Sequence, residues 1–538
     1  MGLIKTPQRL YAEKLVKERQ DLNPTEIAKL VYKKFPKETK SVEGARTTVR
    51  IAIGRHGVAH RKDTILKELF RPTTFKIKEP KQYKDAAKRK LHKSQYYLIT
   101  WAQNNTPIHK EFWANIQAYS KFLGAEIHVV LGRYKNPNSL NGINEEEFWD
   151  KEILPYADAH RHHLHKYLEL LSDIKVQPTA TNILSDLEGM SGINSCIIGS
   201  PKVQFKVIPS LEGYKPKMMF STGSVTKCNY TDSKAGKKGE FHHTFGFTIV
   251  EIKDKDTFFI RQVTALKNGS FTDLCHNVKD NKVSKIQSID IAILGDSHRG
   301  DHCEIIEQQQ RKWLDIFKPK YTILHDVFNG HSISHHEEKD PIKQFQREQD
   351  NSNNLKKEID ELLIWINSML KYNLVLASAN HNDWLDRYIR SNDWKKNIKN
   401  ALTYIQCANI LLEGKAKKGL IAYFIDGKFG KKVKTLGRDE SFKFNEWELA
   451  QHGDIGTNGS RGNVNQYRKL STKMILGHSH TPIRMDGVIY VGTSTKLRVG
   501  YNTGASSWLN CDVIIHKDNK AQHIIYLGKD KNFTTFKL

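Results

Sequence analysis

Two histidines separated by one residue follow a short apolar run near the end of the chain, in the stretch KMILGHSHTPIRMDGVIYVGTS (residues 473–494). In an extended backbone, side chains two residues apart point to the same side, so His478 and His480 can aim two imidazoles at one point. Neutral imidazole is a common protein ligand for transition-metal ions. The alternative is a pair of ordinary surface or core histidines, and the pair alone leaves both interpretations open.

Three further apolar runs also end in side chains that can bind metal ions, and a polar loop supplies one more. These side chains are Asp296 and His298 after SIDIAILG, Asp326 after KYTILH, Asn380 and His381 after YNLVLASA, and His452 in the loop ELAQHGDIGTNGSRG. Open α/β sheets collect their functional side chains at the carboxyl ends of the strands. The ordered set therefore predicts a metal site at one edge of a sheet.

This set of five motifs resembles, in the same order, that of the calcineurin-like metallophosphoesterases, over about residues 290–515. The resemblance implies an α/β fold with a C-terminal β-sandwich flanked by helices, and a site for two divalent metal ions. It implies that one ion is held by Asp296, His298 and His480, the other by Asn380, His452 and His478, and both by Asp326. It also makes His381 the catalytic histidine beside the phosphate.

The sequence departs from the family pattern at two places. The residue before the bridging Asp326 is usually Gly, and here it is His325. The family pattern G-N-H-[DE] is replaced by ANHN, so Asn382 stands where the family has the acid that orients the catalytic histidine. Asn382 can still form a hydrogen bond but cannot stabilise an imidazolium by charge. The next residue, Asp383, is the alternative partner for His381.

The donor set favours particular metals and a particular reaction. Imidazole nitrogen with carboxylate and amide oxygen, without thiolate, suits Mn²⁺ best here, with Fe²⁺ or Zn²⁺ as alternatives, and disfavours Ca²⁺. Two such ions about 3.5–4 Å apart clamp a phosphate and activate a water molecule for in-line attack. The residues therefore predict hydrolysis of a phosphoester.

Four segments are expected to carry these residues. Residues 286–538 would form the metallophosphoesterase domain, and residues 96–285 a separate α/β domain of unknown role, because YYLITWAQ, a helix and EIHVVLGRY form a βαβ pattern. Its histidine-rich run AHRHHLHKY (residues 159–167) could bind a metal ion, but a solvated helical face is the preferred interpretation, because no fixed acidic partner is visible. Residues 71–95 are basic and apolar-poor and are expected to form a linker.

The first 70 residues predict a helical domain that resembles a helix-turn-helix. Asn23, Pro24 and Glu26 are start signals of one helix, and Ser41 caps a second one that ends at Gly54. The second helix would present Arg46, Thr47 and Arg50 to DNA. The alternative is a small helical hairpin with no role in binding nucleic acid.

The charge distribution supports a polyanionic partner. The chain of 538 residues has a net charge of +26, and residues 1–90 contain 24 Lys+Arg but 10 Asp+Glu, an excess of 14. Such asymmetry favours DNA as the partner. No C-x-x-C pair occurs among the six cysteines, which fits a reducing cytoplasm. The chain also has no run of 18 apolar residues, so no membrane span is predicted.

These features together favour a two-metal DNA nuclease in the cytoplasm. The layout is similar to the double-strand-break repair nuclease branch of the family, and its size and three parts look like the early host-DNA-degrading DNases of siphophages that inject their genome in two steps. Two alternatives remain: a phosphatase or phosphodiesterase acting on small or protein substrates, and a non-enzymatic DNA-binding assembly protein. The sequence leaves open whether copies of the chain associate.

Overall fold

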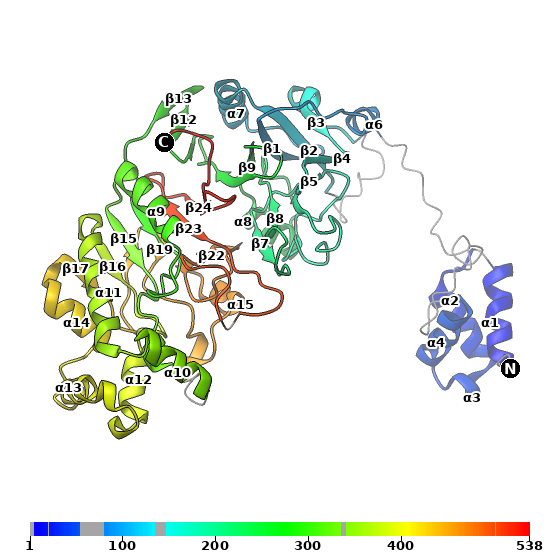
Figure 1. The fold of residues 1–538 in the computed structure, drawn as a ribbon. Coiled ribbons are helices and arrows are strands. Elements are labelled where there is room, and N and C mark those ends of the chain that lie inside the picture. Colours follow the sequence, from blue (N-terminus) through cyan, green and yellow to red (C-terminus); the bar gives the residue numbers. More distant parts are fainter. Residues whose placement is uncertain (1–4, 20, 54–79, 135–146, 335–339, 501) are drawn as a thin grey trace. The chain divides into compact units, whose positions relative to one another are not determined.

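The computed structural model describes residues 5–19, 21–53, 80–134, 147–334, 340–500 and 502–538 (Figure 1). The chain divides into two compact units, residues 1–79 and residues 80–538. Helices and several mixed sheets confirm the predicted α/β class.

The first unit is a small helical bundle around one apolar core. Its helices are α1 (Pro7–Glu18), α2 (Pro24–Lys34), α3 (Pro36–Thr39) and α4 (Val42–Ala52). The predicted start signals are present, because Asn23 and Glu26 form a capping box on α2 and the Ser41 hydroxyl accepts the Gly44 N–H on α4. The predicted helix end at Gly54 lies outside the described residues.

Two sheets of the second unit pack face to face. The six-stranded sheet has the order β17 (Val433–Thr435), β16 (Leu374–Leu376), β15 (Tyr321–Leu324), β14 (Ile291–Ile293), β23 (Cys511–Ile515), β24 (Ala521–Ile525). The ten-stranded sheet has the order β18 (Lys443–Phe444), β19 (Trp447–Glu448), β20 (Lys473–Leu476), β22 (Val488–Tyr490), β21 (Ile483–Met485), β7 (Phe205–Ile208), β8 (Lys217–Ser221), β6 (Ser195–Ile198), β5 (Leu168–Leu171), β4 (Arg161–His165). Ile293 and Val375 of the first meet Ile475 and Ile489 of the second in one core.

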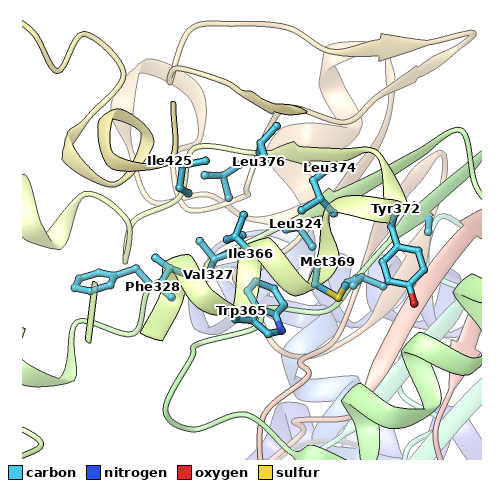
Figure 2. Packing of buried hydrophobic residues seen from close by; sticks show 14 of the residues in the cluster. Leu324, Val327, Phe328, Trp365, Ile366, Met369, Tyr372, Leu374, Leu376 and Ile425 are labelled. Carbon is cyan, nitrogen blue, oxygen red and sulfur yellow. The ribbon is translucent and has the colours of Figure 1, made fainter. Parts of the chain in front are cut away.

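Helices cover the other face of the six-stranded sheet. They include α9 (Glu304–Phe317), α11 (Leu355–Met369) and α14 (Leu420–Phe429). Figure 2 shows Leu324 and Leu376 from the strands beside Ile366 of α11 and Ile425 of α14. Burying such a side chain contributes about 1.5–3 kcal/mol, so this packing fixes the strand ends that follow it. Further helices are α10 (Pro341–Asp350), α12 (Trp384–Ser391), α13 (Ala401–Leu412) and α15 (Val464–Tyr467).

A five-stranded sheet packs on the remaining part of the ten-stranded sheet. Its order is β10 (Phe258–Thr264), β9 (Gly246–Ile252), β1 (Tyr96–Gln103), β2 (Glu126–Gly132), β3 (Ala157–Asp158). Ile99 and Val130 face Leu170 and Phe220 of the ten-stranded sheet, and α7 (Lys110–Leu123) covers the other face. The same half contains α8 (Lys234–His242) and a small sheet of β11 (Phe271–Asp273), β12 (His276–Lys279) and β13 (Lys282–Lys285).

The second unit repeats one topology twice. The order β10-β9-β1-β2-β3 matches β24-β23-β14-β15-β16, with every equivalent pair parallel or antiparallel alike. The order β4-β5-β6-β8-β7 matches β18-β19-β20-β22-β21 in the same way. The segment of residues 96–264, the first half, is therefore a second copy of the fold of residues 291–525, the second half.

Local details of the two halves also correspond. The Val225 N–H donates to the Trp101 carbonyl at 2.9 Å, as the Ser494 N–H does to the Asp296 carbonyl at 2.9 Å. The helices α7 and α9 each have 14 residues and begin at equivalent places. These matches place Trp101 at the position of Asp296.

The halves are joined into one sheet, which changes the predicted domain layout. Antiparallel pairing of β7 with β21 connects the two copies at the centre of the ten-stranded sheet. The boundary expected near residue 286 therefore does not separate two compact units. Pairing between strands far apart in the sequence has no local signature, which is why the sequence suggested two domains.

Two other expectations differ from the structure. Residues 80–95 do not form an exposed linker, because they contain α6 (Lys81–Ala86), whose Ala86 is buried, and Arg89 donates to the Pro155 and Ile127 carbonyls; residues 71–79 lie outside the described part. The run 159–167 contains the strand β4, and both the His162 ring and the His128 ring lie against the buried Asp158 at 2.8 and 2.7 Å. The acidic partner was thus adjacent in sequence.

Candidate metal centre

The first predicted group of ligands lies together at the ends of β14 and β20. His298 Nε2 is 3.0 Å from His480 Nε2, and His480 Nε2 is 3.2 Å from Asp296 Oδ2. All three side chains are buried. Asp296 and His298 follow β14, whereas His480 follows β20 of the opposing sheet, so the packing of the two sheets creates this group.

The second predicted group lies beside the first, with Asp326 between them. Asn380 Oδ1 is 3.1 Å from His452 Nε2 and 3.0 Å from His478 Nδ1. Asp326 Oδ2 is 2.9 Å from His452 Nε2 and 3.7 Å from His298 Nε2 of the first group. The arrangement gives two adjacent sets of nitrogen and oxygen atoms that share one carboxylate.

Four of these residues have a positive φ angle, a backbone conformation that is uncommon for residues other than glycine. The φ angles of His298, Asp326, His478 and His480 are 36°, 41°, 70° and 53°. Such conformations cost of order 1–3 kcal/mol each and persist where surrounding structure imposes them, most often at functional sites. Here they turn the chain sharply after each strand, which brings the side chains back to the sheet edge.

The centre leaves buried polar atoms without partners. Among the described residues, no hydrogen bond reaches either carboxylate oxygen of the fully buried Asp296. Burying an uncompensated carboxylate is costly, and a cation compensates it. The Nε2 atoms of His298 and His480 likewise face each other at 3.0 Å, within reach of one shared ion. The buried His and Asp groups can therefore hold metal ions.

The titration of the centre reflects its opposed charges. Burial alone would raise the pKa of Asp296, but the nearby His452 and His480 lower it to about 2. Burial opposes a charge on His452, yet the carboxylates of Asp326 and Asp296 raise its pKa to about 9. Burial lowers the pKa of His298 well below its usual value. At neutral pH His298 is therefore neutral and Asp296 ionised, the state in which each group binds metal, whereas His452 carries a proton that a bound metal ion would have to displace.

The predicted catalytic residue, His381, is held by groups that the sequence did not indicate. Its Nδ1 donates to the Asn329 carbonyl at 2.9 Å, and its ring stacks on Trp384 at 3.8 Å between centroids. Its backbone N–H donates to Asp326 Oδ1 at 3.0 Å. The ring also lies 4.3 Å from that of His298, so His381 borders the first group and is itself within reach of a metal bound there.

The two residues expected to orient His381 have other partners. Asn382 accepts the Phe328 N–H at 3.2 Å, and Asp383 forms an ion pair with Arg438 at 2.6 Å. Both therefore stabilise the surrounding loops. A backbone carbonyl leaves no trace in the pattern of side chains, which explains why Asn329 was missed.

Gly477 is a further residue that the motifs did not single out. A Cβ atom at this position would lie 2.3 Å from Asp296 Oδ1 and 3.0 Å from His452 Nδ1. Only glycine therefore leaves room for the carboxylate between β20 and β14. His325, which stands in place of the glycine usual before Asp326, is fully buried, and its Nδ1 lies 3.5 Å from Nδ1 of His452.

The first half does not repeat this centre at the position of Asp296, although His128, Asp158 and His162 form another buried group that could hold a metal ion. Trp101 stands at the position of Asp296, and Gly199 follows β6 as Gly477 follows β20. A Cβ on Gly199 would meet Val130 at 2.5 Å and Trp101 at 2.9 Å. The first half therefore keeps the glycine but packs the apolar side chains of Val130 and Trp101 against it.

The proposed DNA-contacting residues lie in the first unit, on α4. Arg46 forms an ion pair with Glu43 at 2.7 Å, Arg50 lies 4.0 Å from the same carboxylate, and Thr47 is partly exposed beside them. Their side chains are accessible on one face of the helix, while Val49 is buried. Their role in binding stays a prediction.

Comparison with known proteins gives one informative match. No family model matches the chain, and no solved structure matches it. No helix among the described residues is long and apolar enough to cross a membrane. Protein A1 of Escherichia phage T5 is 30% identical over 469 residues, which covers 79% of this chain and 80% of that protein. The chain therefore belongs to the family of the phage T5 protein A1.

Proposed function

We propose that the chain is a metal-dependent DNA nuclease that acts during phage infection. The observation that carries the proposal is the buried pair of ligand groups that share Asp326. The sequence motifs resemble those of the calcineurin-like metallophosphoesterases, and that resemblance supports a two-metal site formed by these groups. The match to a phage protein supports the phage setting.

The residues of the candidate centre would have different roles in hydrolysis. Two divalent ions, Mn²⁺ by preference, would polarise the phosphodiester and lower the pKa of a bound water. Asp326 would hold both ions, and the remaining ligands would fix their positions. Because His381 donates through Nδ1 to the Asn329 carbonyl, Nε2 is the ring atom left for proton transfer. It would protonate the leaving oxygen from the imidazolium form of the ring, which burial opposes and the Asp326 carboxylate favours. The stacking on Trp384 fixes the ring plane for that transfer.

DNA is proposed as the substrate because of charge. The net charge of +26 and the basic first unit favour a polyanion over a small phosphoester. The capped helices α2 and α4, with Arg46 and Arg50 exposed on α4, support a DNA-binding role for that unit.

The test compares substrates and variants. Purified protein with Mn²⁺ is given linear duplex DNA, single-stranded DNA and bis-p-nitrophenyl phosphate, alongside Asp326→Ala. We expect the wild type to cleave DNA and the variant to lose cleavage and both metals. Cleavage of the small diester without cleavage of DNA would favour the phosphodiesterase alternative. DNA binding without any hydrolysis would favour the assembly protein, and full activity of Asp326→Ala would contradict the two-metal site.

A further inference from the structure

A large groove lies where the two halves of the second unit meet, away from the candidate metal centre. It has a volume of about 1110 Å³, and both halves line it. Lys473 at the start of β20 borders the groove, whereas His478 follows the end of that strand. Five residues of extended chain span roughly 16 Å, so the groove and the centre lie at opposite ends of β20.

The groove carries more positive charge than its carboxylates can neutralise. Its two carboxylates already have partners, because Glu446 pairs with Lys473 at 2.6 Å and Asp486 pairs with Arg468. Among the described residues, five further lining cations form no ion pair: Lys202, Lys443, Lys469, Arg484 and Lys520. Like charges held together without anions repel one another, and a bound anion relieves that repulsion.

Two of these cations are withdrawn from water. Lys202 is 1% exposed, and Arg484 donates to the Ala521 carbonyl at 3.2 Å. Burial lowers the pKa of Lys202 to about 8 and that of Arg484 to about 10. Groups that have already lost part of their hydration lose less on binding an anion, so the groove is prepared for one.

The rim of the groove also presents an aromatic side chain to solvent. Phe241 of α8 lines the groove and is 84% exposed, with its ring 5.0 Å from that of His242. An exposed aromatic ring beside lysines is the combination on which unpaired nucleic-acid bases stack while their phosphates contact cations. In a duplex the bases are already stacked, so this combination favours a single strand.

The duplicated fold gives one lysine of the groove a counterpart in the sequence of the second half. Lys202 follows Gly199 by three residues, just as His480 follows Gly477 by three residues. The Lys202 Nζ donates to the Ala180 carbonyl at 2.5 Å, which holds the amine in place. The first half thus has a cation where the sequence of the second half has a proposed metal ligand.

We propose that this groove binds a single strand of nucleic acid, with its lysines and arginines on successive phosphates and Phe241 stacked on a base. The strand would lie across the junction of the two halves. The site does not depend on the hydrolytic activity proposed above, since none of the residues that line it belongs to the metal centre.

The test measures binding without hydrolysis. A fluorescein-labelled oligo(dT) is titrated with the full chain in EDTA at several salt concentrations. The variants are Lys443→Glu with Lys469→Glu, and Phe241→Ala, all at exposed positions. The control is Lys279→Glu with Lys282→Glu, a cross-strand pair of exposed lysines on the β12–β13 hairpin outside the groove. Thermal melting verifies that each variant is folded.

We expect both groove variants to weaken oligo(dT) binding at least about tenfold. Each phosphate contact contributes a salt slope of about 0.7 on single strands, so the double lysine variant should flatten the slope by about 1.4. The control should match the wild type. Equal weakening in groove and control variants would show that binding depends only on the overall charge of the protein, which would overturn the proposal. Unchanged binding in both groove variants would overturn it as well. A wild type that binds oligo(dT) in EDTA but hydrolyses nothing with Mn²⁺ would contradict the proposed nuclease and leave this groove supported.

Discussion

Replacing Gly477 by alanine is predicted to displace one metal ligand without unfolding the protein. The added Cβ would lie 2.3 Å from Asp296 Oδ1 and 3.0 Å from His452 Nδ1. Ordinary van der Waals contact begins at 3.4 Å, so the Asp296 carboxylate has to move by about 1 Å. Because the carboxylate is completely buried between the two sheets, the neighbouring side chains and strands have to absorb this movement.

A displacement of about 1 Å in a catalytic arrangement typically costs about 10²-fold in rate, which corresponds to about 2.7 kcal/mol of activation free energy. Overpacking itself is expected to lower the free energy of unfolding by about 1–3 kcal/mol. The two effects are separated by measuring hydrolysis of bis-p-nitrophenyl phosphate per folded molecule, together with bound metal by mass spectrometry and thermal unfolding by circular dichroism.

The duplicated fold supplies a matched control in Gly199→Ala. Its Cβ would lie 2.5 Å from Val130 Cγ1 and 2.9 Å from Trp101 Cδ1, so it creates a similar clash but touches no predicted ligand. We expect this variant to lose stability and to keep its metal and its rate. The reasoning is refuted if Gly477→Ala retains the wild-type rate and metal content, or if Gly199→Ala loses both to the same extent.

Three further predictions address catalysis, DNA binding and pH. His381→Ala should keep the bound metal and lose about 10²–10⁴-fold in rate; metal counting beside a cleavage assay measures this, and loss of metal in step with activity would make His381 a ligand. Residues 1–79 contain 19 Lys+Arg and 9 Asp+Glu. Their deletion should weaken duplex binding and flatten the dependence of the binding constant on salt by about 0.9 per lost phosphate contact. An unchanged slope in binding titrations would place duplex recognition in the second unit. Burial raises the pKa of Asp512 from 3.8 to about 6, so its favourable contribution to folding is complete below about pH 4, and about 3 kcal/mol is lost as the pH rises from about 4 through 6. Unfolding in EDTA should show the wild type losing stability relative to Asp512→Asn between about pH 4 and 7, with little further change above that, and parallel curves would contradict it.

The sequence indicated the candidate metal centre because all of its proposed ligands except His452 closely follow an apolar strand. Asp296, Asp326 and His480 could be recognised from such local patterns, and the structure brings them together. The helix caps of the first unit were equally local, since Asn23 and Ser41 act on residues within one turn. Local patterns of this kind can be recognised in a single sequence.

Features that depend on distant contacts could not be predicted. The Asn329 carbonyl orients His381 through the backbone, and the importance of Gly477 is visible only once Asp296 is placed against it. The duplication left one short trace, GSVTK at residues 223–227 and GTSTK at residues 492–496, in which equivalent hydroxyls pair at 2.9 and 2.8 Å. Five residues with two differences are too weak a repeat to recognise without the matching topology.

The pairing of β7 with β21 has a consequence for the origin of the molecule. Two copies of one half, joined through these strands, would form a symmetric dimer in which every substitution occurs on both sides of the axis. Such a dimer cannot give up one active site without giving up the other. Fusion of the copies into one chain removes that constraint, because each half then mutates independently. In such a fusion Trp101 would fill one ancestral site while Asp296 stays in the other, and a symmetric ancestor would give an asymmetric protein with one candidate metal centre and one surface free for a different task.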